Sequence, residues 1–586
     1  MRTSYDGHVT GYGYDLGGYH REIGTDDAEA AAWFDRGLIW SYAFNHEEAV
    51  DCFERAAGAD PSCAMAYWGI AYALGPNYNK PWVFFDDDDL RNTVARTHQA
   101  VARAHAVAGP ARPVERALID ALAHRYPVAR VTDAPARTPV WNARYADAMA
   151  VVYRDFGDDP DVAALYADAL MNLTPWQLWD LRTGDPAPGS RAREAEQVLD
   201  RALAGPVGLR HPGLLHLYIH LVEMSTAPER GLALADLLPA LVPDAGHLQH
   251  MPSHLQVLCG DYRGAITANS RAIAADAAFL ARSGPMNFYT LYRAHNFHFR
   301  IYAAMLAGRS QIALETARQL EAAIPEQLLR VPSPPMADWL EGFLAMRVHV
   351  LIRFGRWREI LELPLPDDPA LYCVTTAMLH YARGVALAAT GRVDEAVAER
   401  DLLHATAARV PDERMLFNNT CPDILAVAAA LLDGEISYRA GEIDQAFADL
   451  RRAVALDDAL PYDEPWGWMQ PTRHAYGALL LEQGHVGQAR EIYAADLGID
   501  DTLPRALQHP GNVWSLHGLH ECLTRLDRPA EARLIAQQLR IAAAVADVTI
   551  VASCFCRLSA IDPAPSSTGD RDGDGGSADH GCCGGP

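Results

Sequence analysis

The chain contains 586 residues, of which 50% are hydrophobic and 21% are charged, and its formal net charge at pH 7 is −25. This length and hydrophobic content predict a folded protein with a large buried core. Nucleic acids and anionic membrane surfaces select basic proteins, so the negative charge argues against both as partners.

Three further features indicate a protein of the reducing cytoplasm. The first residues, Met1–His8, contain no apolar stretch of the kind found in secretory signals. No apolar run reaches the length of a membrane span. The ten cysteines are scattered singly, apart from the pairs Cys554/Cys556 and Cys582/Cys583. That spacing suits a reduced compartment better than a disulfide framework, and we therefore expect a cytoplasmic protein.

The residue pattern recurs at two spacings, that of a helical turn and that of a longer repeat. Strand signals are nearly absent, and apolar residues recur at helical spacing almost throughout. A repeat of about 34 residues is marked by the residue types that the tetratricopeptide (TPR) pattern requires. Small residues let the two helices of a hairpin cross closely, aromatic residues fill the gap between repeats, and proline ends the second helix. In the first copy these residues are Trp33, Gly37, Ala49, Phe53, Ala56 and Pro61.

The same marks return downstream. Weaker copies carry turns at 259–262, 307–310 and 354–357. We predict an all-α, TPR-like superhelix of roughly eight helical hairpins with ordered loop insertions, compact from about residue 28 to 560. The clearer downstream copies are Gly384 with Ala396, Gly434 with Ala446 and Ala453, Gly477 with Ala489 and Tyr493, and Trp514 with Gly518 and Ala530.

Composition divides the chain further. Two stretches interrupt the repeats, namely Gly75–Asn79 with the acidic run Asp86–Asp89, and Pro175–Asp180 continuing to Gly189. Long aromatic loops in a helical array are often functional, so we expect both to cover a site. The predicted regions are a leader (1–27), an N-terminal TPR-like region with insertions (28–204), histidine-rich repeats (205–330), C-terminal TPR-like repeats (331–561) and a disordered Gly/Ser/Asp-rich tail (562–586).

Several motifs carry a resemblance to a widespread group of bacterial tetratricopeptide-repeat proteins, and it spans most of residues 30 to 530. The resemblance implies the helical-repeat fold. It implies no particular activity or substrate. The shared stretches are 42–49, 63–79, His211-Pro-Gly through Glu223, Gly246-His247 through His254, 292–298 and 462–465.

Eight of the 23 histidines lie between His211 and His298. Residues three, four and seven apart share one helical face, and converging imidazoles are a common metal-binding arrangement. A single histidine on an apolar face is more often a core imidazole bonded to a backbone carbonyl, so the prediction rests on the whole set. The predicted metal ligands are His216, His220 and Glu223, then His247, His250 and His254, then His295 and His298.

Pro252 leaves one point open. Proline has no backbone N–H to donate to a helical hydrogen bond, so Pro252 either kinks a helix or lies in its first turn. If a helix begins near Pro252, His247 and His250 lie on the preceding loop, and helical spacing no longer ensures their convergence with His254.

The ligand types restrict the metal. Magnesium and calcium prefer oxygen ligands, whereas imidazole suits zinc, copper, iron and nickel. Two three-residue groups can hold two metals, in the style of a binuclear copper or iron centre; one metal with additional histidines around it fits equally well. The surplus of ligands over the four of a structural zinc site favours an open, catalytic centre.

Other residues are weaker candidates. Glu223 and Tyr289 are the candidate catalytic groups, as base and proton donor, although a core role is the alternative for the tyrosine. The candidate substrate-binding residues are His46, Asn79, Trp176, Trp179 and Arg473; the two tryptophans either cover a pocket or anchor their own loop. His46 rests only on the resemblance, and the other interpretation there is a helix cap by Asn45. For Arg473 the alternative to carboxylate binding is a structural ion pair.

Two functions follow. The first is a metal-dependent enzyme on a TPR scaffold that acts on a small-molecule substrate, with redox chemistry at copper or iron favoured over a zinc hydrolase that uses Glu223 as general base. The second is a scaffold whose groove binds a peptide or protein partner, as helical repeat arrays generally do.

Overall fold

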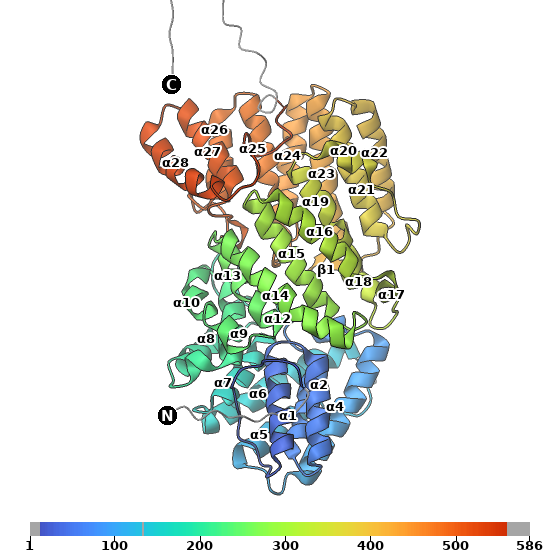
Figure 1. The fold of residues 1–586 in the computed structure, drawn as a ribbon, viewed down its shortest axis with the longest axis vertical. Coiled ribbons are helices and arrows are strands. Elements are labelled where there is room, and N and C mark those ends of the chain that lie inside the picture. The colour runs from blue at the N-terminus through green and yellow to red at the C-terminus, as the bar shows by residue number, and fades with distance from the viewer. Residues whose placement is uncertain (1–11, 132–133, 559–586) are drawn as a thin grey trace, which may run out of the picture.

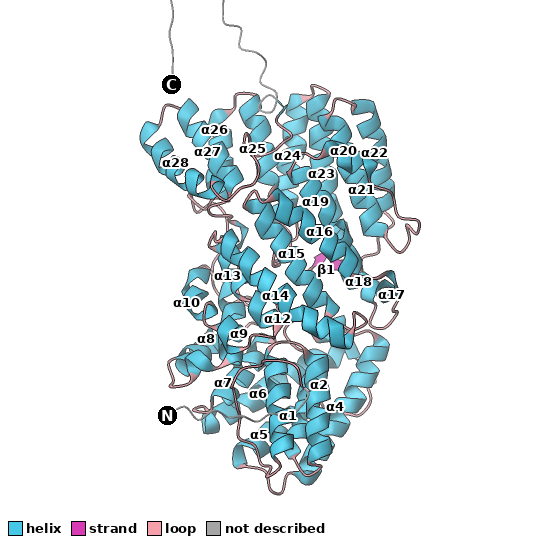
Figure 2. Cartoon of the chain, viewed as in Figure 1, coloured by secondary structure: helices cyan, strands magenta, loops and turns pink. Residues whose placement is uncertain are grey.

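The computed structural model describes residues 12–131 and 134–558, and helices follow one another along almost all of this length (Figures 1 and 2). Within the described residues the only sheet is a two-stranded antiparallel ribbon, β1 (Met415–Leu416) with β2 (Asn419–Thr420). The predicted all-α class is confirmed. The predicted disordered tail 562–586 lies outside the described residues.

The N-terminal third forms one end of the elongated molecule (Figure 1). The segment before the first helix is anchored there, because Arg21 donates to Asp159 and Asp161. The helices of this third are α1 (Ala28–Tyr42), α2 (His46–Ala59), α3 (Ala64–Leu74), η1 (Trp82–Phe84), α4 (Asp87–Val107), α5 (Pro113–Ala123), α6 (Ala134–Phe156), α7 (Pro160–Met171) and α8 (Ala192–Leu203).

The central third is less regular and contains several short helices. Figure 1 shows α9 to α15 in green in the middle of the molecule, and α20 beside α22 at the upper end. Its helices are η2 (Gly208–Arg210), α9 (Pro212–Glu223), η3 (Pro228–Gly231), α10 (Leu232–Ala235), α11 (Leu238–Leu241), α12 (Gly246–His250), α13 (Pro252–Leu258), α14 (Tyr262–Ser283), α15 (Thr290–Leu306), α16 (Ser310–Ala323), α17 (Glu326–Leu329), α18 (Met336–Leu340), η4 (Glu341–Ala345), α19 (Met346–Arg353) and α20 (Trp357–Glu362).

The C-terminal third returns to regular hairpins. Successive helices pair as α21 with α22, α23 with α24, α25 with α26 and α27 with α28. Their bounds are α21 (Cys373–Ala389), α22 (Val393–Ala407), α23 (Cys421–Arg439), α24 (Ile443–Asp458), α25 (Thr472–Glu482), α26 (Val486–Asp496), η5 (Arg505–Leu507), α27 (Val513–Arg525) and α28 (Pro529–Ala543).

The small and aromatic residues of the repeat pattern have the packing role that the sequence predicts. Phe53 of α2 is fully buried against Gly37 of α1, where an added Cβ would lie 2.7 Å from its ring. Tyr493 of α26 packs against Gly477 of α25, where an added Cβ would lie 2.6 Å from the tyrosine ring. Close helix crossing and aromatic filling therefore hold both ends of the array together.

The hairpin turns share one geometry. The residue after the turn donates its backbone N–H to the carbonyl five residues earlier in the chain, as Asn45 does to Trp40 and Arg309 to Ala304. The residue before it is left-handed, which favours glycine, and most hairpins have glycine there. These are Gly260, Gly308, Gly355, Gly391, Gly441 and Gly484. The first hairpin instead has Phe44, with φ of 53°, and the last has Asp527, also with φ of 53°.

The two predicted insertions are ordered, but the acidic run of the first belongs to the start of a helix and not to a loop. Asp86 caps α4 by accepting from the N–H groups of Asp88 and Asp89, so the acidic run begins a helix. Trp179 is buried and donates to the carbonyl of Leu221, which anchors the second insertion.

A local disulfide joins Cys554 and Cys556. Within the described residues no helix combines the length and apolar character that crossing a membrane requires.

Candidate metal centre

Four helices of the central third bring the clustered histidines together. α9 carries His216 and His220, α12 carries His247 and His250, α13 carries His254, and α15 carries His295 and His298. All of these side chains are buried. The chain remains helical at Met251, the joint between α12 and α13, and Pro252 is the first residue of α13, so α12 and α13 follow each other without a loop.

The imidazoles gather into two groups of three. We call His216, His220 and His247 site A, and His250, His254 and His295 site B. Within each site, one potential ligand atom from every residue lies within 4.8 Å of the others. The grouping differs from the order in the sequence, because His247 joins the histidines of α9 and His295 of α15 completes the set of α12 and α13.

Each site is covered by one phenylalanine. The ring centroid of Phe44 lies 4.5, 5.7 and 5.4 Å from those of His216, His220 and His247, the three members of site A. The ring centroid of Phe299 lies 5.0, 5.0 and 5.4 Å from those of site B. The two sites therefore have the same construction, three imidazoles and one apolar ring.

Hydrogen bonds fix the tautomers in site A. Nδ1 of His216 lies 2.6 Å from the carbonyl oxygen of Tyr42, and Nδ1 of His220 lies 2.9 Å from a carboxylate oxygen of Glu223. Because both partners accept, each Nδ1 must donate, and the Nε2 atoms keep their lone pairs. Neither Nε2 has a partner, and neither nitrogen of His247 has one. Buried acceptors without partners each cost about 1–3 kcal/mol, so a ligand is the expected explanation.

Site B shows the same arrangement in a closer form. Nδ1 of His250 lies 2.7 Å from the amide oxygen of Asn269, whose nitrogen is used on the carbonyl of Ala265. Nδ1 of His254 lies 2.6 Å from Glu223. Both Nε2 atoms are then acceptors, yet they face each other at 2.7 Å. Two lone pairs at this distance repel unless a proton or a metal cation lies between or beside them.

The electrostatics favour neutral imidazoles. Burial lowers the pKa of His220 and of His250 to about 3 and holds that of His254 well below its usual value. Burial raises the pKa of Glu223 and Glu464, and the neighbouring Glu223 charge raises that of Glu464 again. The two carboxyls therefore favour sharing at least one proton, and when Glu464 holds it Glu223 accepts from both imidazoles.

The other predicted site residues lie at different distances from the two sites. His298 belongs to neither site, and its ring lies near Phe343 and Phe417. The hydroxyl of Tyr289 donates to Asp276 at 3.0 Å and accepts the backbone N–H of His247. His211, the first histidine of the stretch, caps α9 and contacts Asp161 at 3.1 Å.

The predicted substrate-binding residues are also dispersed. Trp176 has its ring 6.2 Å from His220, whereas Trp179 holds its own loop. Arg473 is used in a two-bond ion pair with Asp458, the structural alternative. Asn45 caps α2, and His46 follows with both ring nitrogens unpartnered. Asn79 lines an apolar cavity of about 40 Å³ together with Trp176, Tyr292 and Phe417.

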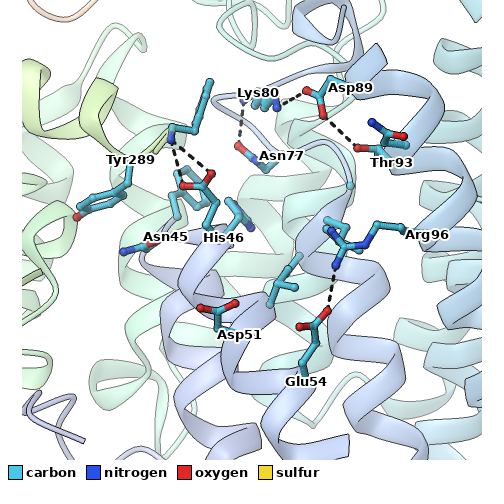
Figure 3. Close-up of a pocket in the computed structure, with 18 of the residues that line it drawn as sticks. Asn45, His46, Asp51, Glu54, Asn77, Lys80, Asp89, Thr93, Arg96 and Tyr289 are labelled. Atoms are coloured by element: carbon cyan, nitrogen blue, oxygen red, sulfur yellow. Dashed lines mark hydrogen bonds and ion pairs between the residues drawn. The ribbon is translucent and has the colours of Figure 1, made fainter. Parts of the chain in front are cut away.

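A larger, open cavity lies beside site A. Its volume is about 340 Å³, and residues of α2, α4 and the start of α15 line it, together with the loop between α3 and α4 (Figure 3). Phe44 lines this cavity and also covers site A, and Tyr292 lines it with its ring 5.1 Å from that of His247. We call it the outer cavity.

Sequence reasoning missed several residues of the centre. Tyr42 and Asn269 orient imidazoles through oxygens that carry no sequence signal for this role. Phe44 is visible only as an aromatic residue in a turn where most of the other repeats have glycine. Glu464 lies in one of the motifs of the resemblance, but nothing in the sequence links it to Glu223.

The hairpins and their turns define a helical-repeat protein of the TPR type. No family model matches the chain, and no curated protein matches it in sequence. At 11–14% identity, the likeness to solved structures concerns the fold alone, and TM-scores of 0.19–0.31 support no argument about function.

Three solved structures are similar over most of their length. The APC/C hetero-tetramer Cut9-Hcn1 has 12% identity over 86% of this chain and 78% of that one, with a TM-score of 0.31. Naa15/Naa10 bound to HypK has 14% identity over 87% and 70%, with a TM-score of 0.21. The TPR domain of P58(IPK) has 11% identity over 86% and 99%, with a TM-score of 0.19.

Proposed function

We propose that sites A and B each bind one transition-metal ion through three imidazoles, and that the protein is a metal-dependent oxidoreductase. The observation that carries the proposal is the 2.7 Å contact between the Nε2 atoms of His250 and His254, whose Nδ1 atoms both donate elsewhere. A metal ion removes the repulsion. The competing explanation is a proton: burial raises the pKa of Glu223, and a protonated Glu223 that donates to Nδ1 of His254 leaves Nε2 of His254 as a donor to His250.

The donor set supports copper or iron. Sites A and B each offer three imidazole nitrogens, and three ligands leave a coordination position open for a reactant; a third group, His220, Glu223 and His254, takes one imidazole from each site and adds a carboxylate. Glu223 supports this assignment by orienting one imidazole from each site, His220 and His254, as carboxylates do around metal-bound histidines. A zinc hydrolase remains the variant within this class, but a general base needs a free oxygen, and both oxygens of Glu223 accept from imidazoles.

The test is the metal content of protein purified without a histidine tag. We expect two equivalents of copper or iron per chain in the wild type. His220→Ala should lose the ion of site A, and His250→Ala that of site B, with little change in the helical circular dichroism because many repeat interfaces hold the fold. His485→Ala, at an exposed turn, is the matched control. Metal below 0.3 equivalents in all four proteins would refute the proposal.

The second candidate is a scaffold that binds a peptide or protein partner. The open outer cavity along α2 and α4 supports it, together with the general use of helical repeats as binding surfaces. Under this function a partner binds the metal-free protein, and the alanine variants of sites A and B retain that binding. A pull-down with wild type and His250→Ala therefore separates the two functions once metal content is known.

A further inference from the structure

The outer cavity has the size of a small-molecule site. At about 340 Å³ it lies at the lower end of the range for ligand pockets, about 300–1,000 Å³. Figure 3 shows its lining from three directions, with Asn45, His46, Asp51 and Glu54 of the first hairpin, Thr93 and Arg96 of α4, and Tyr289 beside α15.

The charges in the lining leave an excess of carboxylate. Lys80 is paired with Asp89 at 2.6 Å, and Arg96 with Glu54 at 3.0 Å. In the described part of the chain, Asp51 forms no ion pair. Glu47 accepts backbone N–H groups; burial raises its pKa, and those hydrogen bonds and the charge of Lys80 oppose the rise. His46 adds no positive charge, because burial lowers its pKa to about 3. The unbalanced charge therefore favours a cationic ligand.

Two buried polar groups beside these carboxylates lack a partner. The side-chain nitrogen of Asn45 has no acceptor although the residue is 1% exposed. Both ring nitrogens of His46 are buried without partners. A ligand ammonium group can donate to the lone-pair nitrogen of His46, whereas the amide nitrogen of Asn45 is a donor and is left for a water molecule.

The remaining lining is apolar and aromatic. Phe44, Val50, Phe288 and Tyr292 form the inner side of the cavity, and flat rings favour a flat partner. Phe44 and Tyr292 also contact the imidazoles of site A, so a molecule in the cavity is separated from that site by one aromatic ring.

We propose that the outer cavity binds a small arylalkylamine, with its ammonium group at Asp51 and Glu47 and its aromatic ring against Phe44 and Tyr292. Its assignment as the substrate rests on the proposed oxidoreductase function; its binding does not. The site is therefore testable in the metal-free protein.

The experiment is calorimetric titration of metal-free and metal-loaded protein with four probes. 2-Phenylethylamine should bind both forms. 2-Phenylethanol and phenylacetate, which keep the ring but lose or reverse the charge, should bind at least tenfold more weakly, and n-butylamine, which keeps the charge without the ring, should do so as well. Equal binding of the alcohol would overturn the cationic class, and equal binding of butylamine would overturn the aromatic part.

The variants locate the site. Asp51→Asn, at an exposed position of α2, should weaken 2-phenylethylamine at least tenfold and leave 2-phenylethanol unchanged. Asp444→Asn, at an exposed position of α24, is the matched control and should change neither. An unchanged affinity in Asp51→Asn would refute the assignment. Amine binding to a protein that takes up no metal would refute only the proposed function, whereas two bound metals without amine binding would refute only this inference.

Discussion

Oε2 of Glu223 lies 2.6 Å from Nδ1 of His254, and both side chains are buried. The carboxylate comes from α9 and the imidazole from α13, so the contact joins two helices of the central third. The other oxygen of Glu223 accepts from His220 of site A. One carboxylate thus fixes the orientation of an imidazole in each site, and a change to it affects both sites together.

We therefore expect Glu223→Gln to weaken metal binding at both sites. The amide presents one acceptor and one donor, so one of the two imidazoles faces a donor and loses its orientation. Loss of such a partner typically lowers metal affinity about 10–100-fold. Competition with a chelator measures the change. Glu464→Gln is the control, because a protonated carboxyl and an amide are similar in shape and charge. Equal affinities in the wild type and Glu223→Gln would contradict the orienting role.

His247 is buried without hydrogen-bond partners, so we expect its replacement to raise the free energy of unfolding and to weaken metal binding at site A. His247→Phe removes two unpartnered nitrogens and keeps a ring, so the metal-free protein should gain about 1–2 kcal/mol in free energy of unfolding while site A loses its metal. His474→Phe is the control, since both nitrogens of that buried histidine are bonded, to Arg353 and Asp496. It should lose about 2–3 kcal/mol. Urea unfolding of both variants measures the difference, and destabilisation by His247→Phe would contradict the prediction.

The buried imidazoles also predict acid sensitivity of the metal-free protein. Their folded pKa values lie below the unfolded value of about 6.5, so below pH 6.5 the unfolded chain binds more protons and stability falls by about 1.4 kcal/mol per pH unit for each group. The groups lowered to about 3 are His46, His220, His250, His298 and His349.

Buried carboxyls act in the opposite sense. Burial raises the pKa of Asp276 to about 7 and that of Asp457 to about 6, so the folded state holds these protons and the two groups favour folding as pH falls towards 4. Four further imidazoles with lowered pKa values outweigh these two carboxyls: His216, His247, His254 and His295. We expect urea midpoints to decrease from pH 7 through 6 to 5. A constant or increasing midpoint would show that the carboxyls dominate.

The left-handed turn residue Phe44 leads to a prediction about the rate at which metal leaves site A. Phe44→Gly relieves the backbone at φ of 53° but removes the ring that covers site A, so chelators should extract the metal at least tenfold faster. Asp527→Gly has the same φ in the last hairpin and covers no site. It should raise stability by up to about 1 kcal/mol without changing the extraction rate. Stopped-flow chelation measures both, and equal rates would show that Phe44 is no barrier.

The fold could be predicted from the sequence because it depends on local marks. Gly37 and Phe53, like Gly477 and Tyr493, meet within one hairpin, so their spacing is enough to predict the contact. The shared helical faces of His216 with His220 and of His250 with His254 are likewise local, and these pairs lie together in the structure.

The composition of the sites could not be predicted in the same way. Whether His247 faces α9 or α15 depends on the angles between short helices, which the repeat pattern does not specify. The acceptors of His216 and His250 are Tyr42 and Asn269, and a backbone carbonyl gives no signal in a sequence. The sequence allows Arg473 to pair with a ligand or with Asp458. The choice depends on how α24 and α25 meet, which the sequence pattern does not specify.

The turn at Phe44 has a consequence for the biosynthesis of the protein. Tyr42, in the same turn region, accepts from His216, which follows 174 residues later. At about 5–20 residues per second, the ribosome needs roughly 9–35 seconds to make that length, and longer to reach His295 of site B. During this interval the histidines that the ring of Phe44 covers in the complete fold have not yet been made. The covering element thus exists before the histidines it covers, and the proposed metal binding at site A cannot begin until the chain has been synthesised past His247.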